Sequence, residues 1–137
     1  MTDRYIDGFF YGLFMDGDIL HEQGVKPVNF RQGYVENFAL RVGKRATLVP
    51  SVGARAYGML IALTHPDLDR LYSAPGLVQY RLEAVLAQTL EGEATPALCY
   101  NLRRGPLPDE YDPDYAARLQ RVLRKLGFPA EYIADVL

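Results

Sequence analysis

The sequence predicts an α+β fold, with a mixed, mostly antiparallel sheet curled into a partial barrel, short helices at its ends and a C-terminal helix packed outside it. Segments rich in aromatic and β-branched residues recur through the first two thirds of the chain, as expected of strands. Two of them, residues 79–90 and 94–102, flank a short turn with glycine at its centre, which favours an antiparallel hairpin. The last long helical pattern has one apolar face, so it packs on the sheet from one side.

Residues 6–14 form the first apolar segment, which is dense in aromatic residues and interrupted by glycines. This composition favours a buried strand that runs into a tight loop. Residues 16–24 then have the pattern of a short helix closed by Gly24. Residues 28–42 have the β-branched and aromatic content of one long strand or a bent hairpin, with Gly33 as the expected bulge.

Residues 55–63 are apolar on both faces, as expected of a central strand. Thr64 follows, with a proline in the next turn and Asp67 three residues later, which is a helix N-terminus signal close to a capping box. We expect this helix to run through Leu71 and to stop near residues 74–76.

The composition changes after Asn101 to Arg, Gly, Pro and Asp, which predicts a surface loop at residues 103–112. Asp112 and Pro113 then begin a helix whose apolar residues recur at helical spacing, namely Tyr115, Leu119, Val122, Leu123 and Leu126. Gly127 ends this helix, and a short final helix follows it.

The chain has 137 residues, the length of one domain. We place this domain at residues 1–137, with its core at about residues 5–102 and the C-terminal loop and helices at residues 103–137. A formal net charge of −2 gives no basic field that would attract nucleic acid. No apolar stretch approaches the ~20 residues of a membrane span, and the N-terminus lacks the form of a signal peptide. We therefore expect a cytoplasmic protein that binds neither nucleic acid nor membrane.

Cys99, the one cysteine, lies in an apolar run, which is typical of a buried side chain rather than a nucleophile. His21 and His65 fall on separate predicted helices without partners at ligand spacing, so we expect no metal site. The glycine patterns of nucleotide-binding loops and the nucleophile elbow do not occur in the sequence, so we expect no cofactor. We expect a solvated face to be formed by the basic side chains of the C-terminal helix, which are Arg118, Arg121, Arg124 and Lys125.

Two local patterns follow one another in an informative order. The first is FFYGLFM at residues 9–15, which is similar to a Tyr-Gly-Ser/Thr-Leu-Met strand-to-loop signature. The second is YGMLIAL at residues 57–63, followed by the short helix HPDLDRLY, Gly76 and a strand that Tyr80 opens. Over about residues 9–102 this order resembles the gamma-glutamylcyclotransferase-like family, which includes gamma-glutamylamine cyclotransferase and a butirosin-biosynthesis cyclotransferase.

This resemblance implies a particular reaction. The substrate's own α-amine attacks its γ-glutamyl carbonyl, closes the five-membered lactam 5-oxoproline and expels the amine portion. Because both reacting groups belong to one molecule, holding the right conformer supplies much of the rate. Backbone N–H groups of the loop are expected to cradle the glutamyl carboxylate or the developing oxyanion. A carboxylate of the protein is expected to carry a proton from the ammonium to the leaving amine.

The resemblance also places the substrate on this chain, with expected contacts from Tyr11, Gly12, Leu13, Phe14, Met15 and Tyr80. Gly12 is expected to allow the turn and the close approach of a ligand. Leu13 stands where the family usually has Ser or Thr, and Phe14 where it usually has Leu, so we expect a more apolar pocket. The cavity is expected between this loop and residues 75–80.

The family's catalytic glutamate directly precedes the glycine that follows the short helix, and alignment on Leu71 and Gly76 puts Pro75 there. Proline has no titratable group and no N–H, so it cannot transfer a proton. The substitute candidates are Glu83 and Glu36, each of which is otherwise explained as an exposed cross-strand charge. Helix capping explains two further acidic residues after the loop, Asp16 and Asp18.

Three functions remain open at this point. The first is an active cyclotransferase with a relocated carboxylate, acting on a gamma-glutamyl amine or amino acid. The second is a pocket that binds an amino-acid-like ligand without turnover, and the third is a domain for protein contacts with a filled cavity. The first predicts an acidic side chain near the loop amides, the second an open cavity without one, and the third no cavity. A homodimer is compatible with each.

Overall fold

The structure is a computed structural model that describes residues 4–73 and 77–136. In these residues the chain forms five strands, one 3-10 helix (η1) and four α-helices. Their order is β1 (Tyr5–Phe10), η1 (Leu13–Met15), α1 (Gly17–Glu22), β2 (Val28–Val42), β3 (Ala46–Thr64), α2 (His65–Tyr72), β4 (Arg81–Thr89), β5 (Ala94–Asn101), α3 (Pro113–Leu126) and α4 (Ala130–Ala134).

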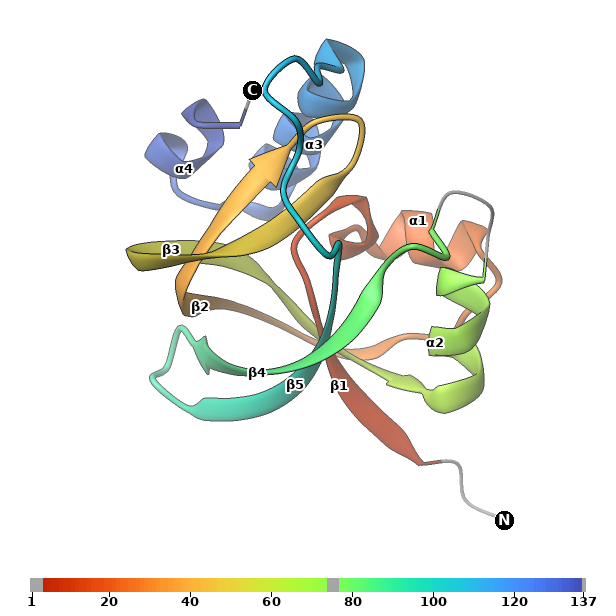
Figure 1. The fold of residues 1–137 in the computed structure, drawn as a ribbon. Coiled ribbons are helices and arrows are strands. Elements are labelled where there is room, and N and C mark those ends of the chain that lie inside the picture. Colours follow the sequence, from red (N-terminus) through yellow and green to blue (C-terminus); the bar gives the residue numbers. More distant parts are fainter. Residues whose placement is uncertain (1–3, 74–76, 137) are drawn as a thin grey trace.

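The five strands close into a small barrel in the order β1-β3-β2-β4-β5 (Figure 1). Four neighbouring pairs are antiparallel, and a parallel contact of Gly8 with Leu98 joins β1 to β5. The helices α1 and α2 lie together on one side, while α3 and α4 lie beside the β2–β3 hairpin. The predicted α+β fold with a mixed, mostly antiparallel sheet is thus confirmed, and the barrel is closed rather than partial.

The strand β3 is longer than the sequence predicts. It begins at Ala46 instead of Arg55, because residues 46–50 pair with residues 38–42 of β2. Ser51, Val52 and Gly53 separate this stretch of β3 from the next one that pairs with β2, which begins at Arg55, and their small and polar members resemble a loop rather than a strand interior. Its central position is as predicted, since β3 has β1 on one edge and β2 on the other.

The expected bulge at Gly33 is wrong. Register shifts in β2 fall instead around Asn29 and Asn37, which have φ values of 58° and 64°. Asparagine tolerates this left-handed conformation better than most residues, so it suits a bulge. Gly33 itself stays in register with Gly58 and Thr89. A Cβ at Gly33 would lie 2.5 Å from the carbonyl oxygen of Gln88, so glycine is needed here for the close approach of β4.

The core fills the barrel and continues beneath α3. Phe9, Leu60 and Leu63 are fully buried in the sheet, and α3 adds Leu119 and Leu123. Burial of a leucine or phenylalanine side chain stabilises the fold by about 1.5–3 kcal/mol. Helix α3 is therefore held on the barrel by its apolar face, as its sequence pattern predicts.

Polar side chains fix where the helices begin. The Thr64 hydroxyl accepts a hydrogen bond from the Asp67 N–H at 3.3 Å, and the Asp112 carboxylate accepts one from the Tyr115 N–H at 3.1 Å. Gly127 ends α3 with a φ of 81°. These predicted caps are confirmed. None of the helices in the described part of the chain is long and apolar enough to span a bilayer.

Candidate functional site

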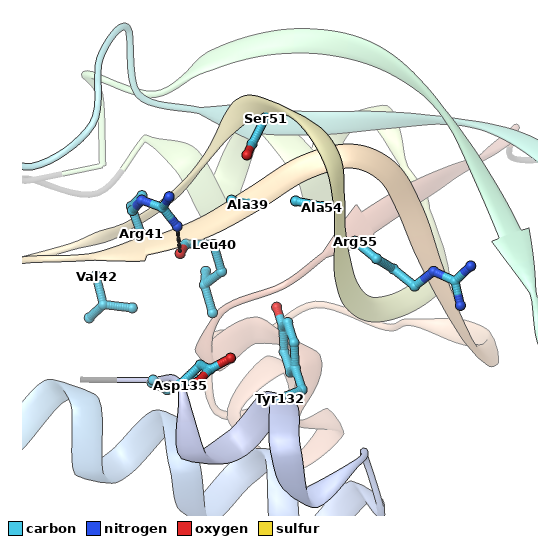
Figure 2. A pocket seen from close by; sticks show the side chains of 10 residues that line it. Ala39, Leu40, Arg41, Val42, Ser51, Ala54, Arg55, Tyr132 and Asp135 are labelled. Carbon is cyan, nitrogen blue, oxygen red and sulfur yellow. Dashed lines mark hydrogen bonds between the residues drawn. The ribbon is translucent and has the colours of Figure 1, made fainter.

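The larger of two notable cavities has a volume of about 600 Å³ and lies between the β2–β3 hairpin and α4 (Figure 2). Its arginines are already engaged, because Arg41 donates to the carbonyl of Leu40 at 3.0 Å and Arg55 donates to Glu36 at 2.7 Å. Figure 2 shows the Arg55 side chain directed away from the space above α4. None of the substrate-binding residues expected from the sequence lines this cavity.

The second cavity has a volume of about 330 Å³ and lies where the sequence predicts one, beside η1 and the segment before β4. Six of its thirteen described lining residues are aromatic. The lining residues are Phe10, Tyr11, Gly12, Leu13, Phe14, Ile19, Gln23, Ala46, Tyr72, Leu77, Tyr80, Tyr115 and Arg118. Five of the six expected substrate-binding residues are therefore brought together here, and we treat this cavity as the candidate site.

The loop after β1 lines this cavity and carries main-chain N–H groups without backbone acceptors in the described structure. In the 3-10 turn, Met15 N–H donates to the Gly12 carbonyl at 3.0 Å and Asp16 N–H donates to the Leu13 carbonyl at 3.1 Å. The N–H groups of Gly12, Leu13 and Phe14 have no backbone acceptor within the residues that the structure describes. Such unpaired donors are normal at the start of a helical turn and can bind an anionic group.

Two of the expected contacts differ from the prediction in detail. The Met15 side chain is 0% exposed and belongs to the core instead of the cavity wall. Gly12 has φ −106° and ψ −151°, an extended conformation that other residues also adopt. A Cβ at Gly12 would lie 3.4 Å from the Tyr115 hydroxyl oxygen, so glycine here leaves space in the cavity and is not required by the backbone.

An aromatic cluster forms one wall of the cavity. Tyr72, the last residue of α2, stacks on Tyr100 with ring centroids 3.7 Å apart and planes 10° apart. Phe14 and Tyr80 meet the Tyr72 ring edge-on, at 5.7 and 5.9 Å between centroids. Edge-on pairs are a favourable arrangement of aromatic rings. Packing on three sides therefore fixes Tyr72, although its place in the site was not predicted.

The phenol groups of this wall are turned to the protein backbone. The Tyr11 hydroxyl donates to the Tyr100 carbonyl at 2.6 Å, and the Tyr80 hydroxyl donates to the Ala46 carbonyl. Burial raises the pKa of Tyr11 and of Tyr72 well above 10, and it raises the pKa of Tyr115 to about 12. These phenols therefore stay protonated at neutral pH and do not act as general bases.

Arg118 is the one charged side chain among the described residues that line the cavity. The ion pairs found in the described part of the chain join other side chains. Arg118 lies on α3, one turn after Tyr115, which also faces the cavity. The basic side chains of α3 are exposed, as the sequence predicts, and Arg118 also brings its guanidinium to the edge of the cavity.

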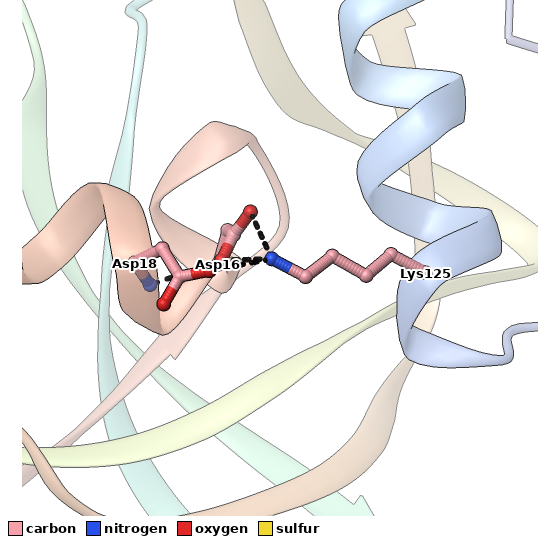
Figure 3. Close-up of polar contacts among 3 residues, drawn as sticks. All are labelled: Asp16, Asp18 and Lys125. Carbon is pink, nitrogen blue, oxygen red and sulfur yellow. Dashed lines mark hydrogen bonds and ion pairs between the residues drawn. The ribbon is translucent and has the colours of Figure 1, made fainter.

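A second basic residue of α3 also has a specific contact (Figure 3). The Lys125 ammonium donates to both carboxylate oxygens of Asp16, at 3.0 and 3.1 Å, and to Asp18 at 2.9 Å. Asp16 also caps α1 by accepting the Asp18 N–H, so its predicted capping role is confirmed. The Lys125 hydrogen bond lowers the pKa of Asp18. This bridge ties α3 to the end of the loop that borders the cavity.

Acidic side chains are not part of the cavity wall in the described structure. Pro75, where the resemblance places the family's glutamate, lies outside the described residues. Glu83 accepts a hydrogen bond from Asn101 Nδ2 at 3.3 Å. Glu36 pairs with Arg55, whose guanidinium carbon lies 4.0 Å from the centre of the Tyr34 ring. Within residues 4–73 and 77–136, no cluster of three His, Cys, Asp or Glu residues is placed to hold a metal ion.

Comparison with solved structures identifies the fold. A structure described as gamma-glutamyl cyclotransferase matches with a TM-score of 0.83 and 18% identity, covering 97% of this chain and 86% of that one. An uncharacterized protein from Homo sapiens matches with a TM-score of 0.82 and 19% identity, covering 96% of this chain and 86% of its own. An AIG2-like protein from Mus musculus matches with a TM-score of 0.59 and 18% identity, covering 80% of this chain and 89% of its own.

The barrel and the loop after its first strand thus define the class of this protein, which has the gamma-glutamyl cyclotransferase-like fold. The resemblance inferred from the two sequence patterns is confirmed at the level of the fold. No family model matches the sequence, and no curated protein matches it.

Proposed function

We propose that this chain binds a small γ-glutamyl or related amino-acid amide in the cavity beside η1, without carboxylate-assisted turnover. The observation that carries the proposal is the chemistry of the cavity wall. Hydrogen-bond donors and a guanidinium lie there, while none of the described lining residues is acidic. The volume of about 330 Å³ lies at the lower end of the range for small-molecule sites, which suits a ligand of this size.

Release of 5-oxoproline requires that the substrate be held in its reactive conformer and that a protein group carry a proton from the ammonium to the leaving amine. Binding can hold the α-amine against its own γ-carbonyl, which supplies effective concentration. Loss of the general acid–base typically slows such a reaction by about 10²–10⁴-fold. Tyrosines cannot replace it at neutral pH, because burial raises the pKa of Tyr115 to about 12 and that of Tyr72 well above 10. A bound γ-glutamyl amide is therefore expected to cyclise slowly at most.

The two other functions left open by the sequence have less support. A domain for protein contacts alone would have its cavity filled by Leu13 and Phe14, whereas these side chains border an open space. An active enzyme with a relocated carboxylate would have Glu83 or Glu36 in the cavity wall, whereas they contact Asn101 and Arg55.

Calorimetric binding and product release, measured on the same samples, test this function. We expect a panel of γ-glutamyl amino acids and γ-glutamyl amines to include ligands that bind at neutral pH, with 5-oxoproline formed at least about 10²-fold more slowly than by an active cyclotransferase assayed alongside. Release as fast as that enzyme's would refute the absence of turnover. Lack of binding by every member of the panel would refute the proposed function as a whole.

A further inference from the structure

We propose that Arg118 holds the carboxylate of the ligand and that the ring cluster of Phe14, Tyr72 and Tyr80 receives its amine portion, so that the cavity selects amides of neutral aromatic amines over amides of cationic amines. This inference rests on the proposed function and adds the class of ligand and the residues that choose it.

The guanidinium of Arg118 is available for a ligand. It borders the cavity and takes part in none of the ion pairs between described side chains. Leu13, whose N–H has no backbone acceptor among the described residues, lines the same cavity. A guanidinium and main-chain N–H groups are the usual donors for a carboxylate, and a guanidinium can bind it through two parallel hydrogen bonds.

The ring cluster offers carbon surface to the ligand. Tyr80 donates its hydroxyl to Ala46, so the hydroxyl is occupied while the ring still lines the cavity. Tyr72 is fixed by stacking on Tyr100, and Phe14 adds a side chain without polar atoms. Rigid aromatic walls favour an apolar or aromatic group, because burial and edge-on contacts both contribute.

A cationic amine portion meets an unfavourable environment here. None of the described residues that line the cavity is acidic. Asp16, which lines an adjacent pocket together with Arg118, already binds the Lys125 ammonium, as does Asp18. A cation can also lie over an aromatic face, but Tyr100 covers one face of Tyr72, and the guanidinium of Arg118 repels a second positive charge in the same cavity.

Three matched ligands test the selectivity by isothermal titration calorimetry with the full chain. They are the γ-glutamyl amides of benzylamine, ethylamine and 1,5-diaminopentane, which carry an aromatic ring, a short alkyl group and a free ammonium. We expect the benzylamide to bind at least about fivefold more tightly than the ethylamide, and the aminopentylamide to bind most weakly.

Two pairs of variants test the residues. Arg118→Gln is expected to weaken benzylamide binding about tenfold, and less at 1 M salt, whereas the control Arg124→Gln on the same helix leaves it unchanged. Phe14→Leu is expected to reduce the preference for the benzylamide over the ethylamide, whereas the control Phe30→Leu, an exposed phenylalanine of β2, does not. Arg118 is exposed, so its replacement should leave the melting temperature unchanged.

The outcomes separate the two proposals. Binding that responds equally to Arg118→Gln and Arg124→Gln, or that favours the cationic amide, overturns the selectivity and leaves the proposed function standing. Failure of all three amides and of the wider γ-glutamyl panel to bind the wild-type chain overturns both. Tighter binding of the benzylamide with a specific effect of Arg118 and Phe14 supports both.

Discussion

Two glycine-to-alanine substitutions are expected to differ in effect: Gly33→Ala should lower the stability of the fold, and Gly12→Ala should weaken ligand binding instead. In Gly33→Ala the new Cβ would lie 2.5 Å from the Gln88 carbonyl oxygen, which is backbone and cannot move without shifting β4. In Gly12→Ala it would lie 3.4 Å from the Tyr115 hydroxyl, which is ordinary contact. The β2–β4 joint has only three paired positions, at Gly33, Tyr34 and Val35. A clash at one of them therefore strains the closure of the barrel.

We expect Gly33→Ala to lower the free energy of unfolding by about 2–3 kcal/mol, the upper part of the range for overpacking, because the neighbour is main chain. For a chain of this length that corresponds to a melting temperature lower by about 7–10 °C. Gly12→Ala should change the free energy of unfolding by less than about 0.5 kcal/mol, since its extended backbone is open to alanine.

Thermal unfolding followed by circular dichroism, with urea unfolding as a second measure, checks this pair. In the benzylamide titration, Gly12→Ala should lose more affinity than Gly33→Ala, because the Gly12→Ala methyl group enters the cavity while the fold persists. Equal melting temperatures for the two variants would refute the reasoning that Gly33 is needed by the approach of β4. Unchanged ligand affinity in Gly12→Ala would refute the placement of the ligand beside η1.

Three further results are expected. The free energy of unfolding should hold up to about pH 10 and fall as the pH rises further through about 12. The reason is that the raised pKa of Tyr115 keeps its phenol neutral in the folded state, while the same phenol in the unfolded chain ionises near pH 10. Urea midpoints from pH 8 to 12 measure this, and a midpoint that rises with pH contradicts it. Cys99, which is 0% exposed and has a pKa raised by burial to about 12, should react with a thiol reagent at pH 8 only after unfolding, and rapid reaction of the native protein counts against its burial. Lys125→Met should increase hydrogen exchange in η1 and α1 but not in β4, since Lys125 ties α3 to Asp16 and Asp18, and equal exchange with the wild type argues against that tie.

Local signals predicted much of the fold. The caps at Thr64 and Asp112 depend on residues three apart in the chain, so a sequence pattern contains them fully. The first half of β3 was missed because residues 46–54 include Pro50 and Gly53, and they become strand only through pairing with β2. The bulge was wrongly placed at Gly33 for the same reason, because glycine is required there by a contact with the distant strand β4 and not by its own backbone.

In the candidate site, too, residues close together in the chain were predicted and those that come from distant helices were missed. Residues of the loop after β1 were found because they are contiguous and resemble a family pattern. Tyr72 and Arg118 were missed as site residues, since they reach the cavity only when two helices dock near that loop. A partial signal existed for Tyr72, which lies one helical turn after the buried Leu68 and thus on the inner face of α2. The homodimer, the single domain and the cytoplasmic location remain predictions.

The bridge from Lys125 to Asp16 joins residues 109 positions apart in the chain. During translation at about 5–20 residues per second, the loop after β1 therefore waits roughly 5–20 s for the helix that completes the ligand cavity. In that interval Asp16 and Asp18 lack their cationic partner. The ligand cavity is therefore among the last parts of the fold that can be completed, because it needs nearly the whole chain.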